Sequence, residues 1–216
     1  MLAAETQSHA LGTASGGALP LENGEVLHSR EFLFRYERMS RVKKAELIEG
    51  VVFMGSPVSV HHARPDGIIH AWLATYASRH PGTEALANVT VILDSENTLQ
   101  PDSLLRRLPA HGGLSRVNAE DYLTGPPELV VEVAGTSASI DLRDKRRAYC
   151  RNGVLEYLVW VVSEARFEWG CLIDEAYRLL EPDAQGVLHS RVFPGLRLPV
   201  AAALAGDAAT VLAALT

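Results

Sequence analysis

Residues 127–134 read PELVVEVA, a short and almost wholly apolar run that predicts a buried central β-strand. Glu132 breaks the run by placing a carboxylate among valines. Burying a carboxylate costs several kcal/mol unless a partner compensates it, and a metal ion is a common compensator. The stretch therefore predicts the middle of a sheet and also a functional position.

A second acid stands at the start of another apolar run upstream. Residues 100–105 read QPDSLL, which predicts a strand that follows Asp102. Glu132 and Asp102 thus belong to two strand-like segments, and each carries its carboxylate within apolar surroundings.

A helix is expected downstream, from about Ile140 to Arg151, ended by the Asn-Gly pair at 152–153. Spacing of three and four residues puts Lys145 near Leu142 and Tyr149 on its inward side. An inward lysine needs an anionic partner. The remaining basic residues form an outward stripe, which is either solvated or in contact with phosphate: Arg143, Arg147 and Arg151.

The N-terminal half supplies further candidates. Residues 45–54 predict a hairpin that turns near Gly50, and Glu49 beside the turn either joins the other acids or faces water. Ser59 opens a long amphipathic helix, with His61 and His62 at its start. The other expected elements are strands at 84–86, 88–93, 156–162, 166–173, 177–180 and 187–192, the last two paired, and helices at 31–36, 119–123, 200–205 and 207–215.

The bulk properties indicate one globular domain. The chain has 216 residues, of which 47% are hydrophobic and 21% charged. We expect a mobile tail over residues 1–25 and a single domain over 26–216. With no membrane-length apolar run and no signal sequence at its start, we expect a cytoplasmic protein. Two cysteines are too few for a disulfide framework.

The charge balance limits the class of partner. The net charge of −6 argues against a protein that coats nucleic acid non-specifically. It leaves room for an enzyme that touches a few phosphates. Three converging carboxylates, from Glu49, Asp102 and Glu132, would need a hard cation such as Mg²⁺ between them. With Lys145 nearby, this is chemistry suited to phosphodiester hydrolysis, although spacing alone is a weak signal.

Several short motifs, in order over most of the chain, resemble the Uma-two family of restriction-endonuclease-like proteins, a branch of the PD-(D/E)XK nuclease superfamily. They are ELIEG at 46–50, SP at 56–57 with a histidine after it, QPD at 100–102, PELVVEV at 127–133, DK at 144–145 with Tyr149, and NGVLEY at 152–157. The resemblance implies an α/β (α+β, mixed-sheet) fold with a restriction-endonuclease-like core, flanking helices and extra β-hairpins. It also implies a metal-dependent DNA endonuclease that uses Mg²⁺ (or Mn²⁺).

The resemblance also assigns residues. Asp102 matches the first acidic metal ligand, Glu132 the second and Glu49 an additional acid. The superfamily lysine usually follows the second acid by two residues, where this chain has Ala134, and Lys145 on the next helix matches instead. His62 matches the family histidine, with His61 as the alternative, and Gln100 and Tyr149 are accessory candidates.

One departure from the family pattern, and the lack of any direct sign of turnover, keep other functions open. The loop at 135–138 reads GTSA and lacks a proline that family members often carry there. Nothing in the sequence demonstrates turnover, so a catalytically silent nuclease-fold binding protein is the alternative, and a hydrolase of small phosphate esters would share the same metal site. A homodimer is compatible with a nuclease that cuts two strands.

Overall fold

The central sheet is built around the strand that the sequence singles out. In the computed structural model, which describes residues 18–135 and 138–215, this sheet has the order β12-β11-β10-β9-β6-β3. Its strands are β3 (Thr83–Ala87), β6 (Ser103–Arg107), β9 (Leu129–Ala134), β10 (Glu156–Val161), β11 (Arg166–Ile173) and β12 (Ala176–Leu179). β9 is parallel to β10 and antiparallel to β6, so it is central, as predicted.

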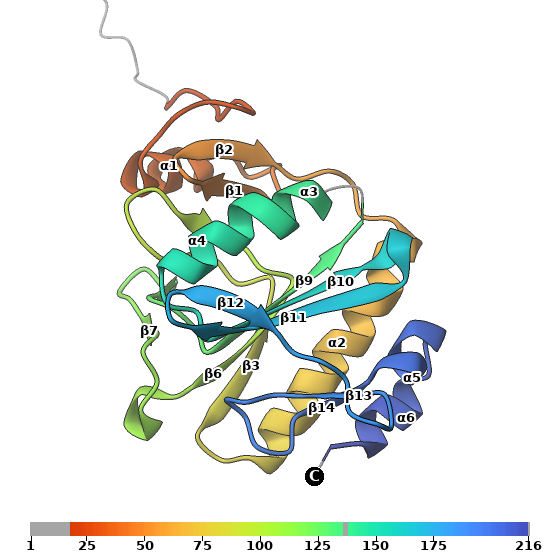
Figure 1. Ribbon diagram of the computed structural model, residues 1–216. Helices are drawn as coiled ribbons and strands as arrows, with labels where there is room; N and C mark the ends of the chain where they lie inside the picture. The colour runs from red at the N-terminus through yellow and green to blue at the C-terminus, as the bar shows by residue number, and fades with distance from the viewer. Residues whose placement is uncertain (1–17, 136–137, 216) are drawn as a thin grey trace, which may run out of the picture.

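Alternation along β9 divides its side chains between two faces. Leu129, Val131 and Val133 enter a core that lies under α2 (Val60–Arg79). The two short C-terminal helices, α5 (Val200–Ala205) and α6 (Ala208–Ala213), complete this layer (Figure 1). Glu132 projects toward the opposite face, and this places its carboxylate on the side where the rest of the site assembles.

The connection from β9 to β10 covers that opposite face. It consists of α3 (Ala138–Ile140), a π-helical turn (Asp141–Lys145) and α4 (Arg146–Arg151). Lys145 and Tyr149 are buried, whereas the predicted arginine stripe is exposed, so the expected orientation of this helix is confirmed. π-Helical turns are rare and are frequent at functional sites.

A second sheet has the order β2-β1-β5-β4-β8-β7, and its β1–β2 end lies above the crossover helix in Figure 1. Its strands are β1 (Ala45–Ile48), β2 (Val51–Met54), β4 (Val91–Ile92), β5 (Thr98–Leu99), β7 (Arg116–Val117) and β8 (Leu123–Thr124). Ala45 and Leu47 of β1 pack against α1 (Ser29–Tyr36), while Ile48 enters the core shared with the central sheet. The β1–β2 hairpin turns at Glu49 and Gly50, as predicted.

Two expected elements are wrong. The predicted helix at 119–123 is a turn between β7 and β8, because Asn118 Oδ1 accepts hydrogen bonds from the amides of Glu120 and Tyr122 and closes a turn instead. The segments near 177–180 and 187–192 do not pair with each other. β12 pairs with β11, and β13 (Val187–His189) pairs with β14 (Arg197–Pro199).

The segment that precedes α1 is docked on the domain. Of the expected 1–25 tail, residues 1–17 lie outside the described residues, and residues 18–25 pack against α1 and β2. Arg35 of α1 donates hydrogen bonds to the carbonyl oxygens of Leu19 and Pro20 and to both carboxylate oxygens of Glu25, each of the latter at 2.7 Å. The packed layer therefore includes residues from the expected tail. Among the described residues, no helix is long and apolar enough to cross a membrane.

Arg35→Met should release this segment, because its two carbonyls and the Glu25 carboxylate lose their shared donor. We expect faster cleavage after Glu22 and Glu25 by a glutamyl endopeptidase, followed by mass spectrometry. Arg38→Met is the matched control, since the Arg38 guanidinium reaches only the Phe34 carbonyl and ring within its own helix region. Equal cleavage of the two variants would show that Arg35 does not hold the segment.

Candidate active site

The two acids that the sequence singled out are joined through the backbone. Asp102 directly precedes β6, and the amide of Val133, next to Glu132, donates a hydrogen bond to Asp102 Oδ2 at 2.8 Å. Two cationic side chains also reach Asp102: Lys44 Nζ lies 3.1 Å from Oδ1 and His62 Nε2 lies 3.6 Å from Oδ2. The antiparallel pairing of β6 with β9 thus brings Asp102 and Glu132 together, as expected.

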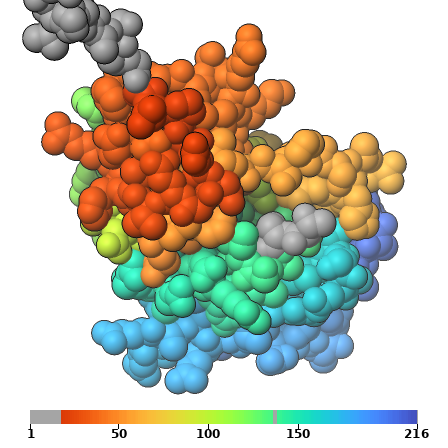
Figure 2. All heavy atoms as spheres, turned by 90° about the horizontal axis from the view of Figure 1, so that it is seen from above, coloured from red at the N-terminus to blue at the C-terminus, as the bar shows by residue number. Residues whose placement is uncertain are grey.

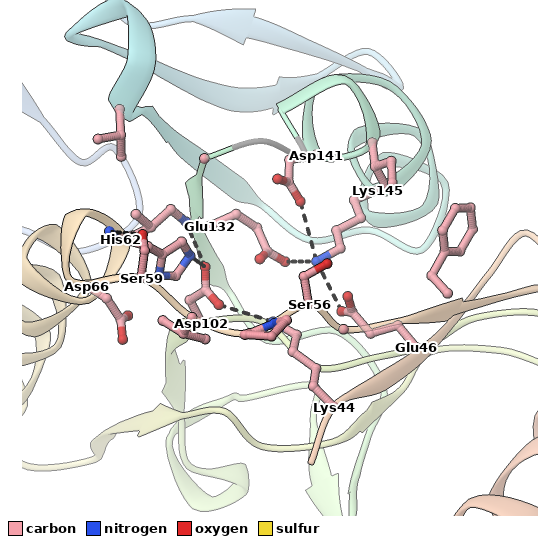
Figure 3. A pocket seen from close by; sticks show the side chains of 18 of the residues that line it. Lys44, Glu46, Ser56, Ser59, His62, Asp66, Asp102, Glu132, Asp141 and Lys145 are labelled. Carbon is pink, nitrogen blue, oxygen red and sulfur yellow. Dashed lines mark hydrogen bonds and ion pairs between the residues drawn. The ribbon is translucent and has the colours of Figure 1, made fainter. Parts of the chain in front are cut away.

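Lys145 is the centre of a buried ion cluster (Figure 3). Its Nζ lies 3.0 Å from Glu132 Oε1, 3.0 Å from Glu46 Oε1 and 3.4 Å from Asp141 Oδ1. Tyr149 donates its hydroxyl to the same Glu132 oxygen at 3.0 Å. One ammonium therefore links β1, β9 and the crossover helix.

The third acid of the cluster is Glu46, and the structure does not bring Glu49 there. Glu49 adopts a left-handed φ of 52° in the hairpin turn, and its carboxylate pairs with Arg151 at 2.9 Å and Arg147 at 3.5 Å. Alternation along a strand puts residues 46 and 49 on opposite sides. The convergence expected for Glu49 is therefore wrong in geometry.

The same alternation was the signal that sequence reasoning missed. Lys44, Glu46 and Ile48 share one side of β1 and its lead-in, whereas Ala45 and Leu47 pack under α1. Asp141 was also missed, although it stands four residues before Lys145, the spacing of neighbours on a helix.

The accessory candidates fall near the site in different ways. His62 reaches Asp102, whereas His61 lines the cavity and is exposed. Gln100 contributes through its backbone, since its amide donates to Glu46 Oε1 at 2.8 Å while its side chain donates to the Asn88 carbonyl. Tyr149 contacts Glu132 directly. His62 thus fits the position expected of the family histidine better than His61 does.

A cavity of about 880 Å³ opens beside these residues. Its charged lining includes Lys44, Glu46, His62, Asp66, Asp102 and Glu132. In the view from above, the orange N-terminal layer, the lighter start of α2 and the green-to-teal helical crossover meet around this hollow (Figure 2). The site is therefore accessible from one end of the molecule.

The electrostatics favour the anionic form of Asp102 and the cationic form of His62. Burial alone would raise the pKa of Asp102, but the contact with His62, the charge of Lys44 and the Val133 amide outweigh it and hold that pKa well below its usual range. The contact with Asp102 raises the pKa of His62. Asp102 is thus ready to bind a cation at neutral pH.

Glu132 behaves in the opposite way. Burial raises the pKa of Glu132 to about 8, against the opposing charge of Lys145 and with the negative charges of Asp102 and Asp141 adding to the rise. For Lys145, burial works against the charged form, but the three carboxylates raise its pKa well above the usual value. The cluster therefore carries an excess of negative charge that favours either proton uptake or a further cation.

The donor set fits a divalent ion that takes part of its ligands from elsewhere. Among the described residues, no three His, Cys, Asp or Glu side chains form a ready-made metal cage. Magnesium commonly binds through one or two carboxylates plus water and substrate phosphate. Asp102 is anionic and borders the cavity, and no hydrogen bond from the described residues reaches Glu132 Oε2.

Comparison with known proteins identifies the fold. A family model described as "Putative restriction endonuclease", the Uma-two family, matches residues 30–201. A crystal structure of "a putative nuclease belonging to DUF820" from Anabaena variabilis is similar with a TM-score of 0.65 at 11% sequence identity, covering 81% of this chain and 98% of that chain. The expected restriction-endonuclease-like α/β fold is thereby confirmed. No curated protein matches the chain.

Lys145→Met should destabilise the domain strongly, because it leaves the carboxylates of Glu132, Glu46 and Asp141 without their shared cation. Removing one partner of a buried ion pair typically costs about 3–5 kcal/mol. Urea denaturation should show this loss, and adding Glu132→Gln to the same chain should recover part of it. A double variant as unstable as the sum of the two single variants would contradict the coupling.

Glu132→Gln alone should leave the fold intact and change its pH dependence. A carboxyl with a raised pKa keeps its proton in the folded state while the unfolded state loses it, so the free energy of unfolding falls between about pH 5 and pH 8. Each pKa unit of the shift corresponds to about 1.4 kcal/mol.

The stability gained by the Glu132→Gln variant over the native chain should therefore be larger at pH 8 than at pH 5, in chemical denaturation at both values. His62 is present in both chains, so its own titration cancels in the comparison. A difference that does not depend on pH would mean that Glu132 titrates normally.

Proposed function

Because the chain belongs to the Uma-two family of restriction-endonuclease-like proteins, we propose that it is a divalent-metal-dependent endonuclease that hydrolyses phosphodiester bonds in DNA. One observation supports this most directly: Asp102 and Glu132, from adjacent strands, are linked by the Val133 amide at the edge of an open cavity. Such a pair can hold a hard cation and leave part of its coordination to a substrate phosphate.

Asp102 and Glu132 would hold the ion, which we take to be Mg²⁺ or Mn²⁺. Restriction-endonuclease-like proteins generally use divalent metals. When bound, such an ion polarises a phosphoryl oxygen and lowers the pKa of a bound water. The side chains of the protein position the two metal ligands, as follows.

These side chains position the two ligands. Lys145 and Tyr149 fix the Glu132 carboxylate through its Oε1, so that Oε2 can face the ion. His62 and the Val133 amide fix Asp102 from the other side. Glu46 takes the place that we had expected Glu49 to occupy, and its carboxylate is held by Lys145 and by the Gln100 amide. This network holds the metal ligands in place before substrate arrives.

DNA as the substrate and a homodimer as the assembly remain parts of this proposal. The outward arginines provide limited support for phosphate contact, since Arg147 and Arg151 already pair with Glu49. The alternative is a silent nuclease-fold binding protein. It is favoured by one observation, namely that the described acids of the site already have lysine partners.

Asp102→Asn should abolish divalent-ion binding in calorimetry and Mg²⁺-dependent nicking of supercoiled plasmid, while the variant still folds and melts cooperatively at a lower temperature, because the depressed pKa of Asp102 makes its ionised form stabilising. The fold should survive because an asparagine oxygen can still accept the Val133 amide. If the native chain binds neither Mg²⁺ nor Mn²⁺, or if the variant binds them equally well, the silent binding protein is the better interpretation.

Glu46→Gln and Glu49→Gln form a matched pair three residues apart with the same change in charge. Loss of the Glu46 carboxylate should lower the nicking rate at least about tenfold, which corresponds to about 1.4 kcal/mol of transition-state stabilisation. Glu49→Gln removes only an ion pair with exposed arginines and should nick at nearly the native rate. The reverse order of the two rates would restore Glu49 to the site.

A further inference from the structure

We propose that Lys44, rather than Lys145, is the lysine that contacts the scissile phosphate. This inference rests on the proposed function and concerns the same cavity. In the hydrolysis, the water oxygen bonds to phosphorus as the bond from phosphorus to the leaving sugar oxygen breaks. The water gives up a proton and the leaving oxygen gains one. The Lys44 ammonium keeps its protons and donates to a non-bridging phosphate oxygen as negative charge develops there.

Lys145 is poorly placed for this task. Its side chain is only 5% exposed, and its Nζ lies within ion-pair distance of three carboxylates. Turning the ammonium toward a substrate would strip the cation from those buried acids, a rearrangement that is costly in a low-dielectric interior. Lys145 is therefore a positioning residue that holds Glu132 and Glu46.

Lys44 has the opposite properties. Both lysines line the cavity, but the side chain of Lys44 is 29% exposed. Among the described residues, its one ion-pair partner is Asp102, at 3.1 Å. The side chain is charged, accessible and held by one contact that a competitor can replace.

The backbone opposite Lys44 is shaped to admit this side chain. The Gly55 amide donates to the Lys44 carbonyl at 2.9 Å, which places the end of β2 against residue 44. A Cβ on Gly55 would lie 2.9 Å from Lys44 Cβ and 3.0 Å from its carbonyl oxygen. A side chain at position 55 would therefore force either Lys44 or the end of β2 to shift.

A metal ion and Lys44 compete for the same carboxylate. A divalent ion at Asp102 would repel the Lys44 ammonium. It would also replace that ammonium as the counter-ion of the Asp102 carboxylate. Binding of the ion thus frees the Lys44 Nζ to meet a phosphate that enters the cavity. The consequence is specific: removing the Lys44 charge should tighten metal binding while it slows cleavage. A lysine with a purely structural role would not produce these two opposite effects.

The test compares Lys44→Met with Lys43→Met, which removes the same charge from the exposed neighbouring residue. Mg²⁺ affinity is measured by calorimetry, and kcat and KM by nicking of supercoiled plasmid at saturating Mg²⁺. We expect Lys44→Met to bind Mg²⁺ several-fold more tightly and to lose about 100-fold in kcat, the scale for one lost donor to developing charge. Lys43→Met should match the native chain in both, and Lys44→Arg should recover part of kcat.

The outcomes separate the two proposals. A native chain that nicks plasmid together with a Lys44→Met variant that nicks equally fast would overturn the role of Lys44 and leave the endonuclease standing. A Lys44→Met variant that binds Mg²⁺ more weakly would show that Lys44 supports the site rather than competes for it. A native chain that neither binds Mg²⁺ nor nicks would overturn both proposals. If Lys44→Met fails to fold, Lys44→Gln removes the same charge with a polar side chain and should still lower kcat.

Discussion

The buried contact of Lys145 with the carboxylates of Glu46, Glu132 and Asp141 is the constraint on which the site depends. It joins a strand of the N-terminal layer, the central strand and the crossover helix. Burying such a group brings a desolvation penalty that well-packed apolar residues would avoid, so stability alone does not explain it. The Lys145 ammonium instead fixes the carboxylates in place beside the cavity. Without it, their mutual repulsion would separate them.

A count of charges shows that the lysines of the cluster do not neutralise all of its carboxylates. With all groups ionised, the four carboxylates of Glu46, Asp102, Glu132 and Asp141 face two ammonium groups and the His62 imidazolium, so one negative charge remains in excess. The raised pKa of Glu132 is one expression of that excess, because proton uptake relieves it. A divalent cation would relieve it more fully and would do so beside the cavity. Proton uptake by Glu132 and binding of a divalent cation are thus two alternative ways to reduce the excess negative charge of the cluster.

The sequence was sufficient for the parts of the site that are set by local pattern. The apolar run around Glu132 predicted a central strand, and helical spacing predicted that Lys145 points inward; the structure has both. It was insufficient where a turn decides which way a side chain points. Glu49 lies in a left-handed turn conformation, and the contacts of Glu46 with Lys145 and the Gln100 amide show that Glu46 faces the site instead. Lys44 was missed for the same reason, since it precedes the strand whose register orients it.

The lysine expected from the resemblance to nucleases has no place on the central strand. The usual strand position for that lysine, two residues after Glu132, is Ala134, which is fully buried against the crossover helix and has no room for a long cation. Lys145 instead projects from the crossover helix, lies between the acids and serves as their counter-ion. The charge that faces a substrate must then come from another direction. The N-terminal layer provides it, because β1 brings Glu46 inward and its lead-in carries Lys44 to the cavity wall. In the proposed active site, β1 and its lead-in thus supply both an acid, Glu46, and an accessible cation, Lys44.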